Sequence, residues 1–430
     1  MSEYADTLAW LYGLEAARGM DFKLERVALA LAALGDPQRR YPCLHIAGTN
    51  GKGSVAAMLH AMLRAAGHRT GLYTSPHLTR FTERIRIGDA EISEAEVVSF
   101  TQEIRTAATL RGIELTFFEF ITVMAFLAFA RHAVDSAVVE VGLGGRLDAT
   151  NVIDPVATII TTIGLDHEQY LGDTIESIAA EKGGIIKPGC PVVLGRLSDA
   201  ARSVLKGIAA ERNAPVIEAS EEIQIHGTAL LRVSGMGWKI DNLTLALRGR
   251  FQHDNAATAL AAAALVRDRF GLSDGAVRRG LAMVCWPGRL EVVSSAPLIV
   301  LDGAHNEAGV QTLAEELPDV IGKRPLHLLF GVMSDKRWQP MVEQLGPMVR
   351  SATVTAILPP RGEAPERVAA SFRKFCPTTV IPNARQAVRT LLDQIAPSEA
   401  LLVTGSLFLV GAVSDLWPSA TAAATCPAQP

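Results

Sequence analysis

The sequence predicts an α/β protein of two domains, the first built on a mostly parallel sheet and the second on another open α/β sheet. Two observations lead to this fold class. Short β-rich runs alternate with helical stretches for most of the length, an order that is typical of parallel sheets covered by helices. The chain has 430 residues, which is too many for one ordinary core, and the alternating pattern restarts after Trp286-Pro287-Gly288.

The expected strands are short apolar runs, and the expected helices follow the helical period. In the first part of the chain we expect strands at residues 44–47, 70–74, 137–141 and 156–163. We expect helices at residues 55–66, where Gly67 supplies a stop, and at 120–132. In the second part we expect strands at residues 298–301, 327–330, 352–357 and 401–404.

This pattern places a domain boundary near Gly288. We therefore expect one domain over residues 1–288 and a second, another open α/β sheet, over residues 289–417. Residues 418–430 are rich in Ala, Thr and Pro, and this composition predicts a disordered tail.

Composition and charge exclude several classes of protein. Hydrophobic residues make up 49 % of the chain and charged residues 20 %, as in globular proteins. The formal net charge of −4 argues against nucleic acid as the main partner. The longest apolar run, residues 120–130, is too short to span a membrane, and Glu3 and Asp6 stand where a signal peptide would be basic. The 5 cysteines are scattered without a CxxC pair, which argues against zinc and disulfides and favours the cytoplasm.

The strongest local signal is a glycine-rich loop between an expected strand and an expected helix. Its residues are Gly48, Thr49, Asn50, Gly51, Lys52, Gly53 and Ser54. In this context the backbone N–H groups face an anion, while Lys52 can reach the outer phosphates and Ser54 a magnesium ion or a phosphate. The spacing departs from the common G-x-x-x-x-G-K-[ST] pattern, so the alternative is an ordinary glycine-rich turn. Strand, helix and lysine together favour a nucleotide-binding P-loop.

Polar residues lie at the carboxyl ends of three of the expected strands. Ser75 comes after the strand at 70–74, Glu140 ends the strand at 137–141, and His167 follows the strand at 156–163. Ligands bind at the carboxyl edge of an open α/β sheet, so we expect these residues beside the P-loop. Magnesium prefers oxygen ligands, which makes Glu140 the best candidate and Ser75 the next. His167 has an alternative reading as a hydrogen-bonded loop histidine.

A further helix is expected to begin between Asp173 and Glu176, which resemble a capping box. This helix carries Lys182, followed by two glycines. Taken alone, Lys182 reads as a solvated surface lysine.

The ordered set of motifs resembles the folylpolyglutamate and dihydrofolate synthases of the Mur-ligase superfamily. The matching segments are His45–Ser54, Ser75–Leu78, Glu140–Asn151, Gly164–His167, Glu181–Lys182, Trp286–Arg289 and Asp302–Asn306. The resemblance implies an N-terminal P-loop ATPase domain, a C-terminal Rossmann-like domain, and an active site that domain closure completes. Glu307 departs from the family pattern, where many relatives have proline, and Ser54 stands where some have threonine.

The resemblance also implies roles for individual residues. Lys52, Lys182, His167 and Glu140 would be catalytic, with Lys182 at the position of the family's carbamylated lysine. Two magnesium ions would be held by Ser54, Ser75, Glu140 and His167. ATP would be contacted by Thr49, Asn50, Gly51, Lys52, Gly53, Ser54, Asn255, Arg289, Asp302 and His305.

Members of this family with two activities also bind dihydropteroate. By resemblance, the folate contacts would be Asp21, Phe22, Lys23, Leu24, Thr116, Phe117, Phe118, Glu119, Leu147, Asp148 and Ala149. Phe117 and Phe118 suit a flat heterocycle by stacking, and their alternative reading is core residues beside a helix.

The expected function is ATP-dependent addition of L-glutamate to dihydropteroate and to tetrahydrofolates through an acyl phosphate, by a monomer. Three alternatives stay open: a folylpolyglutamate synthase with that single activity, a cell-wall Mur ligase, and a nucleotide switch without ligase chemistry. Cell-wall Mur ligases place a substantial domain before the P-loop, whereas only 47 residues precede Gly48 here. A switch would account for the P-loop and leave Glu140, His167 and Lys182 unexplained.

Overall fold

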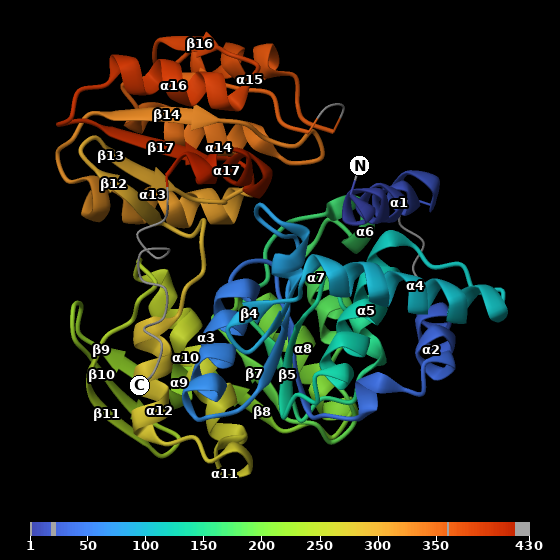
Figure 1. The fold of residues 1–430 in the computed structure, drawn as a ribbon. Coiled ribbons are helices and arrows are strands. Elements are labelled where there is room, and N and C mark those ends of the chain that lie inside the picture. Colours follow the sequence, from blue (N-terminus) through green and yellow to red (C-terminus); the bar gives the residue numbers. More distant parts are fainter. Residues whose placement is uncertain (1, 19–22, 359–360, 418–430) are drawn as a thin grey trace, which may run out of the picture. The chain divides into compact units, whose positions relative to one another are not determined.

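The computed structural model describes residues 2–18, 23–358 and 361–417. They form two compact units (Figure 1). The C-terminal unit contains the described residues from Cys285 on, together with two short segments, Leu165–Glu168 and Leu247–Gln252. The remaining residues up to Val284 form the N-terminal unit. The sequence indicated a single boundary near Gly288 and gave no sign that two earlier segments belong to the second unit.

The N-terminal unit is built on a sheet with the strand order β4-β3-β2-β5-β1-β6-β7-β8. Its strands are β1 (Cys43–Ala47), β2 (Thr70–Tyr73), β3 (Ile85–Ile87), β4 (Ala90–Glu91), β5 (Ser136–Glu140), β6 (Ala157–Ile160), β7 (Val192–Leu194) and β8 (Val216–Glu218). All neighbouring pairs from β2 to β8 are parallel, and β3 and β4 add an antiparallel edge. The expected mostly parallel sheet is confirmed.

The helices of this part of the chain are α1 (Glu3–Arg18), α2 (Leu24–Ala33), α3 (Lys52–Ala65), α4 (Glu94–Leu110), α5 (Phe117–Arg131), α6 (Glu168–Leu171), α7 (Ile175–Gly183), α8 (Asp199–Glu211), α9 (Ala219–Glu222), α10 (Phe251–Leu265), α11 (Arg267–Phe270) and α12 (Asp274–Met283). Short 3₁₀ helices lie at Pro37–Arg39, Phe81–Arg84 and Ala149–Val152. A small antiparallel sheet, which the sequence did not predict, consists of β9 (Gln224–His226), β10 (Leu231–Gly235) and β11 (Trp238–Leu243).

Helices α3 and α5 lie on opposite sides of the central strands (Figure 1). On the α5 side, Gly71 leaves room for the ring of Phe129, because a Cβ atom at Gly71 would come within 2.6 Å of it. Phe126 and Phe129 of α5 are fully buried and pack in the same core as Tyr73 of β2. Gly71 and Tyr73, two positions apart on β2, therefore face α5 on the same side of the sheet.

The C-terminal unit is a second α/β layer structure, as expected, with the strand order β12-β13-β17-β14-β15-β16. Its strands are β12 (Glu291–Ser295), β13 (Leu298–Leu301), β14 (Leu326–Phe330), β15 (Ser351–Val354), β16 (Thr378–Val380) and β17 (Ala400–Thr404). Only the β12–β13 pair is antiparallel among these strands. Its helices are α13 (Glu307–Ile321), α14 (Trp338–Leu345), α15 (Pro365–Phe372), α16 (Ala384–Gln394) and α17 (Leu407–Val413), and 3₁₀ helices lie at Gly346–Met348 and Ser414–Leu416.

Three local predictions need correction. The strand expected at 352–357 is β15 and ends at Val354, because the N–H of Ala356 bonds the carbonyl of Pro382 beyond the end of β16. The strand expected at 156–163 ends at Ile160, because the residues after it turn to bond another loop rather than a neighbouring strand. Helix α7 is capped by Thr174, whose hydroxyl accepts from the backbone N–H of Ser177, and not by Asp173 with Glu176. The tail predicted at 418–430 lies outside the described residues.

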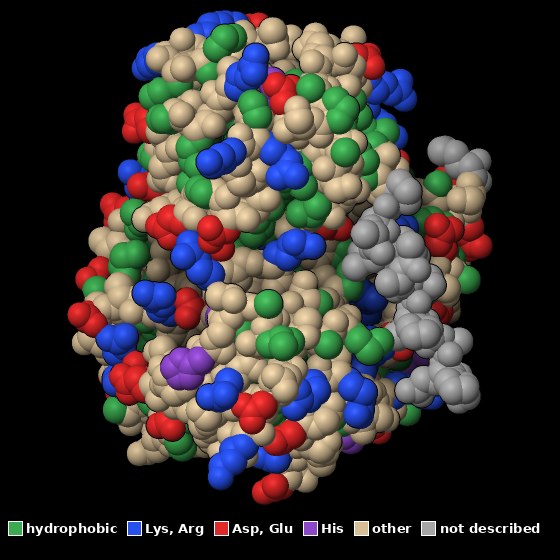
Figure 2. All heavy atoms as spheres, turned by 90° about the vertical axis from the view of Figure 1, so that its left-hand side faces the viewer, with side chains coloured by type: hydrophobic (Ala, Val, Ile, Leu, Met, Phe, Trp, Pro, Cys, Tyr) green, Lys and Arg blue, Asp and Glu red, His purple; other side chains and the backbone are tan. Residues whose placement is uncertain are grey.

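The surface mixes charges of both signs. On the face shown in Figure 2, Lys and Arg side chains lie interspersed with Asp and Glu side chains, as the net charge of −4 leads one to expect.

Among the helices that the structure describes, none is long and apolar enough to cross a membrane.

The core beneath α5 yields a stability prediction. Replacing fully buried Phe126 by Ala should lower the free energy of unfolding by roughly 3–5 kcal/mol, because it leaves a cavity in a packed core. Thermal and denaturant unfolding measure the change. The matched control is Leu110→Ala, since Leu110 is 80 % exposed and its loss should change stability by no more than about 0.5 kcal/mol. Equal effects of the two substitutions would contradict this account of the core.

Candidate active site

The P-loop lies between β1 and α3, as expected from the sequence. Its backbone is held by the segment that follows β6. Thr49 donates its N–H to the carbonyl of Thr162 at 2.7 Å, and its hydroxyl pairs with the backbone of Gly164. The hydroxyls of Thr161 and Thr162 donate to the carbonyl of Asn50 at 2.6 and 3.1 Å. These bonds fix the loop in one conformation before any phosphate arrives.

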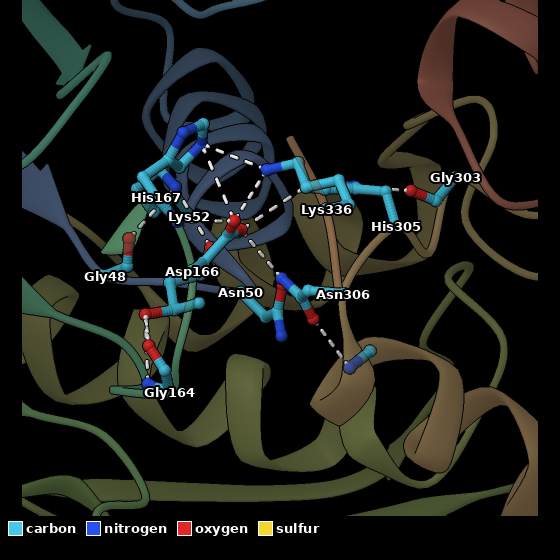
Figure 3. A network of polar contacts seen from close by, with 12 residues as sticks. Gly48, Asn50, Lys52, Gly164, Asp166, His167, Gly303, His305, Asn306 and Lys336 are labelled. Carbon is cyan, nitrogen blue, oxygen red and sulfur yellow. Dashed lines mark hydrogen bonds and ion pairs between the residues drawn. The ribbon is translucent and has the colours of Figure 1, made fainter. Parts of the chain in front are cut away.

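Lys52 opens α3 and turns back over the loop. Its ammonium donates to the carbonyls of Gly48 and Thr49 at 3.0 and 3.1 Å (Figure 3). This arrangement keeps the Lys52 ammonium next to the backbone N–H groups of the P-loop. A phosphate oxygen is a stronger acceptor than these carbonyls, so the same ammonium can exchange them for a phosphate.

Asn255 lies beside the P-loop, although 204 positions separate it from Gly51 in the sequence. Gly51 has φ +86°, and a Cβ atom there would come within 2.4 Å of the Asn255 side-chain oxygen. Only glycine permits this close approach. The structure therefore brings this predicted ATP contact to the loop through the first turns of α10.

Glu140 and Ser75 lie together at the carboxyl ends of the adjacent parallel strands β5 and β2. The backbone N–H of Ser75 donates to a carboxylate oxygen of Glu140 at 3.2 Å. Ser54 is buried in the first turn of α3. These are oxygen donors of the kind that magnesium prefers.

Over residues 2–18, 23–358 and 361–417, no group of three or more His, Cys, Asp and Glu side chains could hold a metal by itself. Protein-bound magnesium often has one or two carboxylate ligands and takes its other ligands from phosphates and water.

Lys182 is buried in the last turn of α7, with a relative exposure of 5 %, so its reading as a solvated surface lysine is wrong. The end of α7 packs against the loop after β5. The N–H of Arg146 donates to the carbonyl of Glu181 at 2.8 Å, and their side chains form an ion pair. A Cβ atom at Gly145 would meet the Lys182 carbonyl at 2.9 Å.

Asp148 organises the loop after β5. One carboxylate oxygen accepts from the N–H groups of Gly142 and Leu143 at 3.0 and 2.9 Å. The other oxygen accepts from the N–H and the hydroxyl of Thr150 at 2.9 and 2.5 Å. Burial raises the pKa of Asp148, while these hydrogen bonds favour its charged form. Asp148, a predicted folate contact, thus also stabilises the loop that carries two further predicted contacts, Leu147 and Ala149.

The other predicted folate contacts fall into different environments. Thr116 and Glu119 form the capping box of α5, and Glu119 also pairs with Arg26 at 2.8 Å, so both side chains have structural partners. Phe117 packs in the core, which favours its core reading, whereas Phe118 is only partly buried. The ring of Phe118 covers Gly142, since a Cβ atom there would come within 2.2 Å of it.

The remaining predicted folate contacts lie just before α2 and at its first residue. Lys23 is exposed and Leu24 begins the helix, while Asp21 and Phe22 lie outside the described residues.

In the C-terminal unit, a buried carboxylate gathers several polar side chains (Figure 3). Asp166 accepts from the ammonium of Lys336 at 2.6 Å and from the amide of Asn306 at 2.9 Å. The ring nitrogens of His305 and His167 lie 3.7 and 3.8 Å from its oxygens. Burial raises the pKa of Asp166. The two histidines, which are protonated at the low pH where this carboxyl titrates, and the Lys336 ammonium outweigh that effect and hold the pKa well below its usual range.

The two histidines of this cluster are neutral at neutral pH, because burial lowers the pKa of each to about 4. His305 also bonds the carbonyl of Gly303 through Nδ1 at 2.8 Å. His167, with φ +53°, lies 3.3 Å from the Lys336 ammonium. A neutral imidazole leaves a nitrogen lone pair for a proton or a metal.

Arg289 and Asp302 lie in the same unit. Asp302 is buried and accepts from the N–H groups of Leu290 and Ala304 at 2.7 and 2.8 Å, which fixes the turn after β13. The guanidinium of Arg289 lies over Gly303, because a Cβ atom there would come within 2.5 Å of it. The structure thus brings together His167, Arg289, Asp302 and His305, whose roles stay predictions.

Sequence reasoning missed the partners that hold these residues. Thr161, Thr162 and Gly164 carry no motif of their own, and only the pairing of β6 with β1 reveals them. Lys336 lies in the loop after β14, five residues beyond Gly331, which is too far from the strand end for the rule that found Ser75 and Glu140.

The Asp166 cluster generates a stability prediction. Lys336→Met should lower the free energy of unfolding of the C-terminal unit by roughly 3–5 kcal/mol, because it leaves the Asp166 carboxylate buried without its charged partner. The double variant Asp166→Asn/Lys336→Met should recover much of that loss, since no buried charge is left unpaired. Calorimetry of the three proteins checks both expectations. A double variant less stable than Lys336→Met would contradict them.

Known proteins resemble this chain over nearly its whole length. Residues 46–263 match the Mur ligase middle domain, and residues 288–407 match the Mur ligase glutamate ligase domain. A dihydrofolate synthase/folylpolyglutamate synthase of Bacillus subtilis is 35 % identical, over 95 % of this chain and 97 % of the relative. A folylpolyglutamate synthase of Lacticaseibacillus casei is 34 % identical, over 95 % of this chain and 97 % of that protein.

A solved structure shows the same fold. The folylpolyglutamate synthase of Mycobacterium tuberculosis, complexed with ADP and AMPPCP, superposes with a TM-score of 0.88 at 36 % identity. The match covers 96 % of this chain and 99 % of the other.

Proposed function

This chain belongs to the dihydrofolate synthase/folylpolyglutamate synthase family of Mur ligases, and we propose that it uses ATP to join L-glutamate to a folate-type carboxylate. The observation that carries the proposal is the P-loop at one sheet edge, held by the end of β6, with Ser75 and Glu140 at the ends of adjoining strands. The relative solved with ADP and AMPPCP supports ATP as the co-substrate.

In the proposed reaction, the acceptor carboxylate attacks the γ-phosphate of ATP, which gives an acyl phosphate and ADP. The amine of L-glutamate then attacks the acyl carbon, the amide bond forms, and phosphate leaves. Lys52 would neutralise charge that spreads over the transferred phosphoryl group. Magnesium bound at Ser54, Ser75 and Glu140 would supply further charge neutralisation on the phosphates, and His167 keeps its proposed role as a magnesium ligand.

We further propose that Lys182 acts as a carbamate, in which addition of CO₂ turns its amine into an anionic oxygen ligand. The burial of Lys182 beside the loop after β5 supports this proposal, because CO₂ adds to a neutral amine and burial disfavours the charged ammonium. A monomer in the cytoplasm is the proposed state, and the free thiols of Cys43, Cys190 and Cys376 fit a reducing compartment.

The proposed acceptors are both dihydropteroate and tetrahydrofolates. The partly buried Phe118 ring over Gly142 supports a site for a flat heterocycle. The Bacillus subtilis relative is named for both activities and the Lacticaseibacillus casei relative for one, so a single folylpolyglutamate synthase activity is the second candidate.

Phosphate release from Mg-ATP with L-glutamate tests the proposal. The three arms contain dihydropteroate, tetrahydrofolate monoglutamate, or no acceptor. We expect release with both acceptors and little without one. Release with only one acceptor would reduce the assignment to that activity. A folded, ATP-binding protein without acceptor-dependent release would overturn the proposal and favour a nucleotide switch.

Lys52→Ala should reduce acceptor-dependent phosphate release by at least about 100-fold, because it removes the cation that faces the transferred phosphoryl group. Circular dichroism and the melting temperature should change little, since the Lys52 ammonium donates to two carbonyls of its own loop, those of Gly48 and Thr49. The matched control is Lys239→Ala, which removes an exposed lysine of β11. Near-normal release by folded Lys52→Ala protein would rule out this role.

A further inference from the structure

A buried histidine of β1 serves no step of the proposed reaction. His45 has no exposed surface, and its Nε2 lies 2.8 Å from the hydroxyl of Thr150. Its Nδ1 has no hydrogen-bond partner among the described residues. A polar nitrogen buried in this way costs free energy, whereas an apolar side chain on the same strand would not. The one bond that His45 makes is therefore the feature to explain.

The direction of that bond follows from its neighbours. The Thr150 hydroxyl has a single hydrogen, and it donates this hydrogen to Asp148, whose two oxygens each receive two bonds. The hydroxyl oxygen must then accept from His45, which requires a hydrogen on Nε2. Burial lowers the pKa of His45 to about 3, so the ring is neutral and its single hydrogen is on Nε2.

This chain of bonds ends on the backbone of the loop after β5. Asp148 receives the N–H groups of Gly142 and Leu143, and the Phe118 ring lies against Gly142. His45 itself belongs to the strand that leads into the P-loop and pairs with Val139 of β5. A hydrogen-bonded path thus runs from inside the sheet to the loop that carries the predicted heterocycle contacts.

We propose that His45 is a positioning residue, which acts through Thr150 and Asp148 to hold the Gly142–Asn151 loop in the shape that receives the acceptor's ring. This inference rests on the proposed function, because it assigns the acceptor to that loop. It predicts that the path controls the affinity for the acceptor and leaves the affinity for ATP unchanged.

The test breaks the path at two places. His45→Leu and Thr150→Val should each raise the KM for dihydropteroate by about tenfold, as expected for the loss of one buried hydrogen bond, with an unchanged KM for ATP. His45→Gln keeps a donor and Thr150→Ser keeps the hydroxyl, so both should stay close to the wild type. The double variant His45→Leu/Thr150→Val should be no worse than the worse single variant, because both substitutions break one path.

His60 supplies a matched control. It is also buried in the N-terminal unit, at 4 % exposure, and bonds one oxygen, the carbonyl of Gly88, at 2.8 Å. Its Nδ1 is likewise without a partner in the described part of the chain. His60→Leu should lower the melting temperature about as much as His45→Leu does, and leave the KM for dihydropteroate unchanged.

The outcomes separate the two hypotheses. Wild-type protein without acceptor-dependent phosphate release would overturn the proposed function. Active wild-type protein together with an unchanged KM for dihydropteroate in folded His45→Leu would overturn the positioning role alone. The same holds if the KM values for ATP and dihydropteroate rise equally, or if His60→Leu reproduces the effect, because either result indicates general distortion of the unit.

Discussion

The backbone of the P-loop is held by the segment that follows β6, a strand next to β1 in the sheet. A glycine-rich loop that presents its N–H groups to an anion cannot satisfy itself by regular secondary structure, so its remaining polar groups need partners elsewhere. Thr161, Thr162 and Gly164 supply them at the end of β6. This explains why β6 stops at Ile160, and it makes the parallel pairing of β1 with β6 a condition for the nucleotide site.

The same stretch of chain continues into the second unit. Gly164 bonds Thr49 in the N-terminal unit, and only Leu165 separates it from Asp166, which the C-terminal unit binds through Lys336 and Asn306. The desolvated carboxylate stays charged because several donors and positive partners surround it. A short segment therefore carries both the last P-loop support and the first residue of the Asp166 cluster.

Buried polar groups recur wherever a loop must keep a fixed shape. Asp148 holds the loop after β5, Asp302 holds the turn after β13, and each receives backbone N–H groups on its carboxylate oxygens. In both cases burial raises the carboxyl pKa, so these loops depend on hydrogen bonds that favour the anion. Asp148 and Asp302, which are predicted ligand contacts, thus also stabilise their loops. Their substitution would disturb the loop conformation as well as the binding of the ligand.

By itself, the sequence determined the α/β class, the mostly parallel N-terminal sheet, the P-loop between a strand and a helix, and the family. These follow from local patterns: hydrophobic period, glycine spacing and ordered short motifs. It also placed Ser75 and Glu140 correctly at strand ends, because parallel strands share a carboxyl edge.

Only the tertiary structure decided which side chains those residues meet. The burial of Lys182, the approach of Asn255 to Gly51, and the pairing of Asp166 with Lys336 all join segments far apart in the chain. No local period or motif encodes such contacts, since they depend on how the strands order themselves in the sheet and how helices pack on it. For the same reason, only the tertiary structure shows that the segments Leu165–Glu168 and Leu247–Gln252 belong to the C-terminal unit.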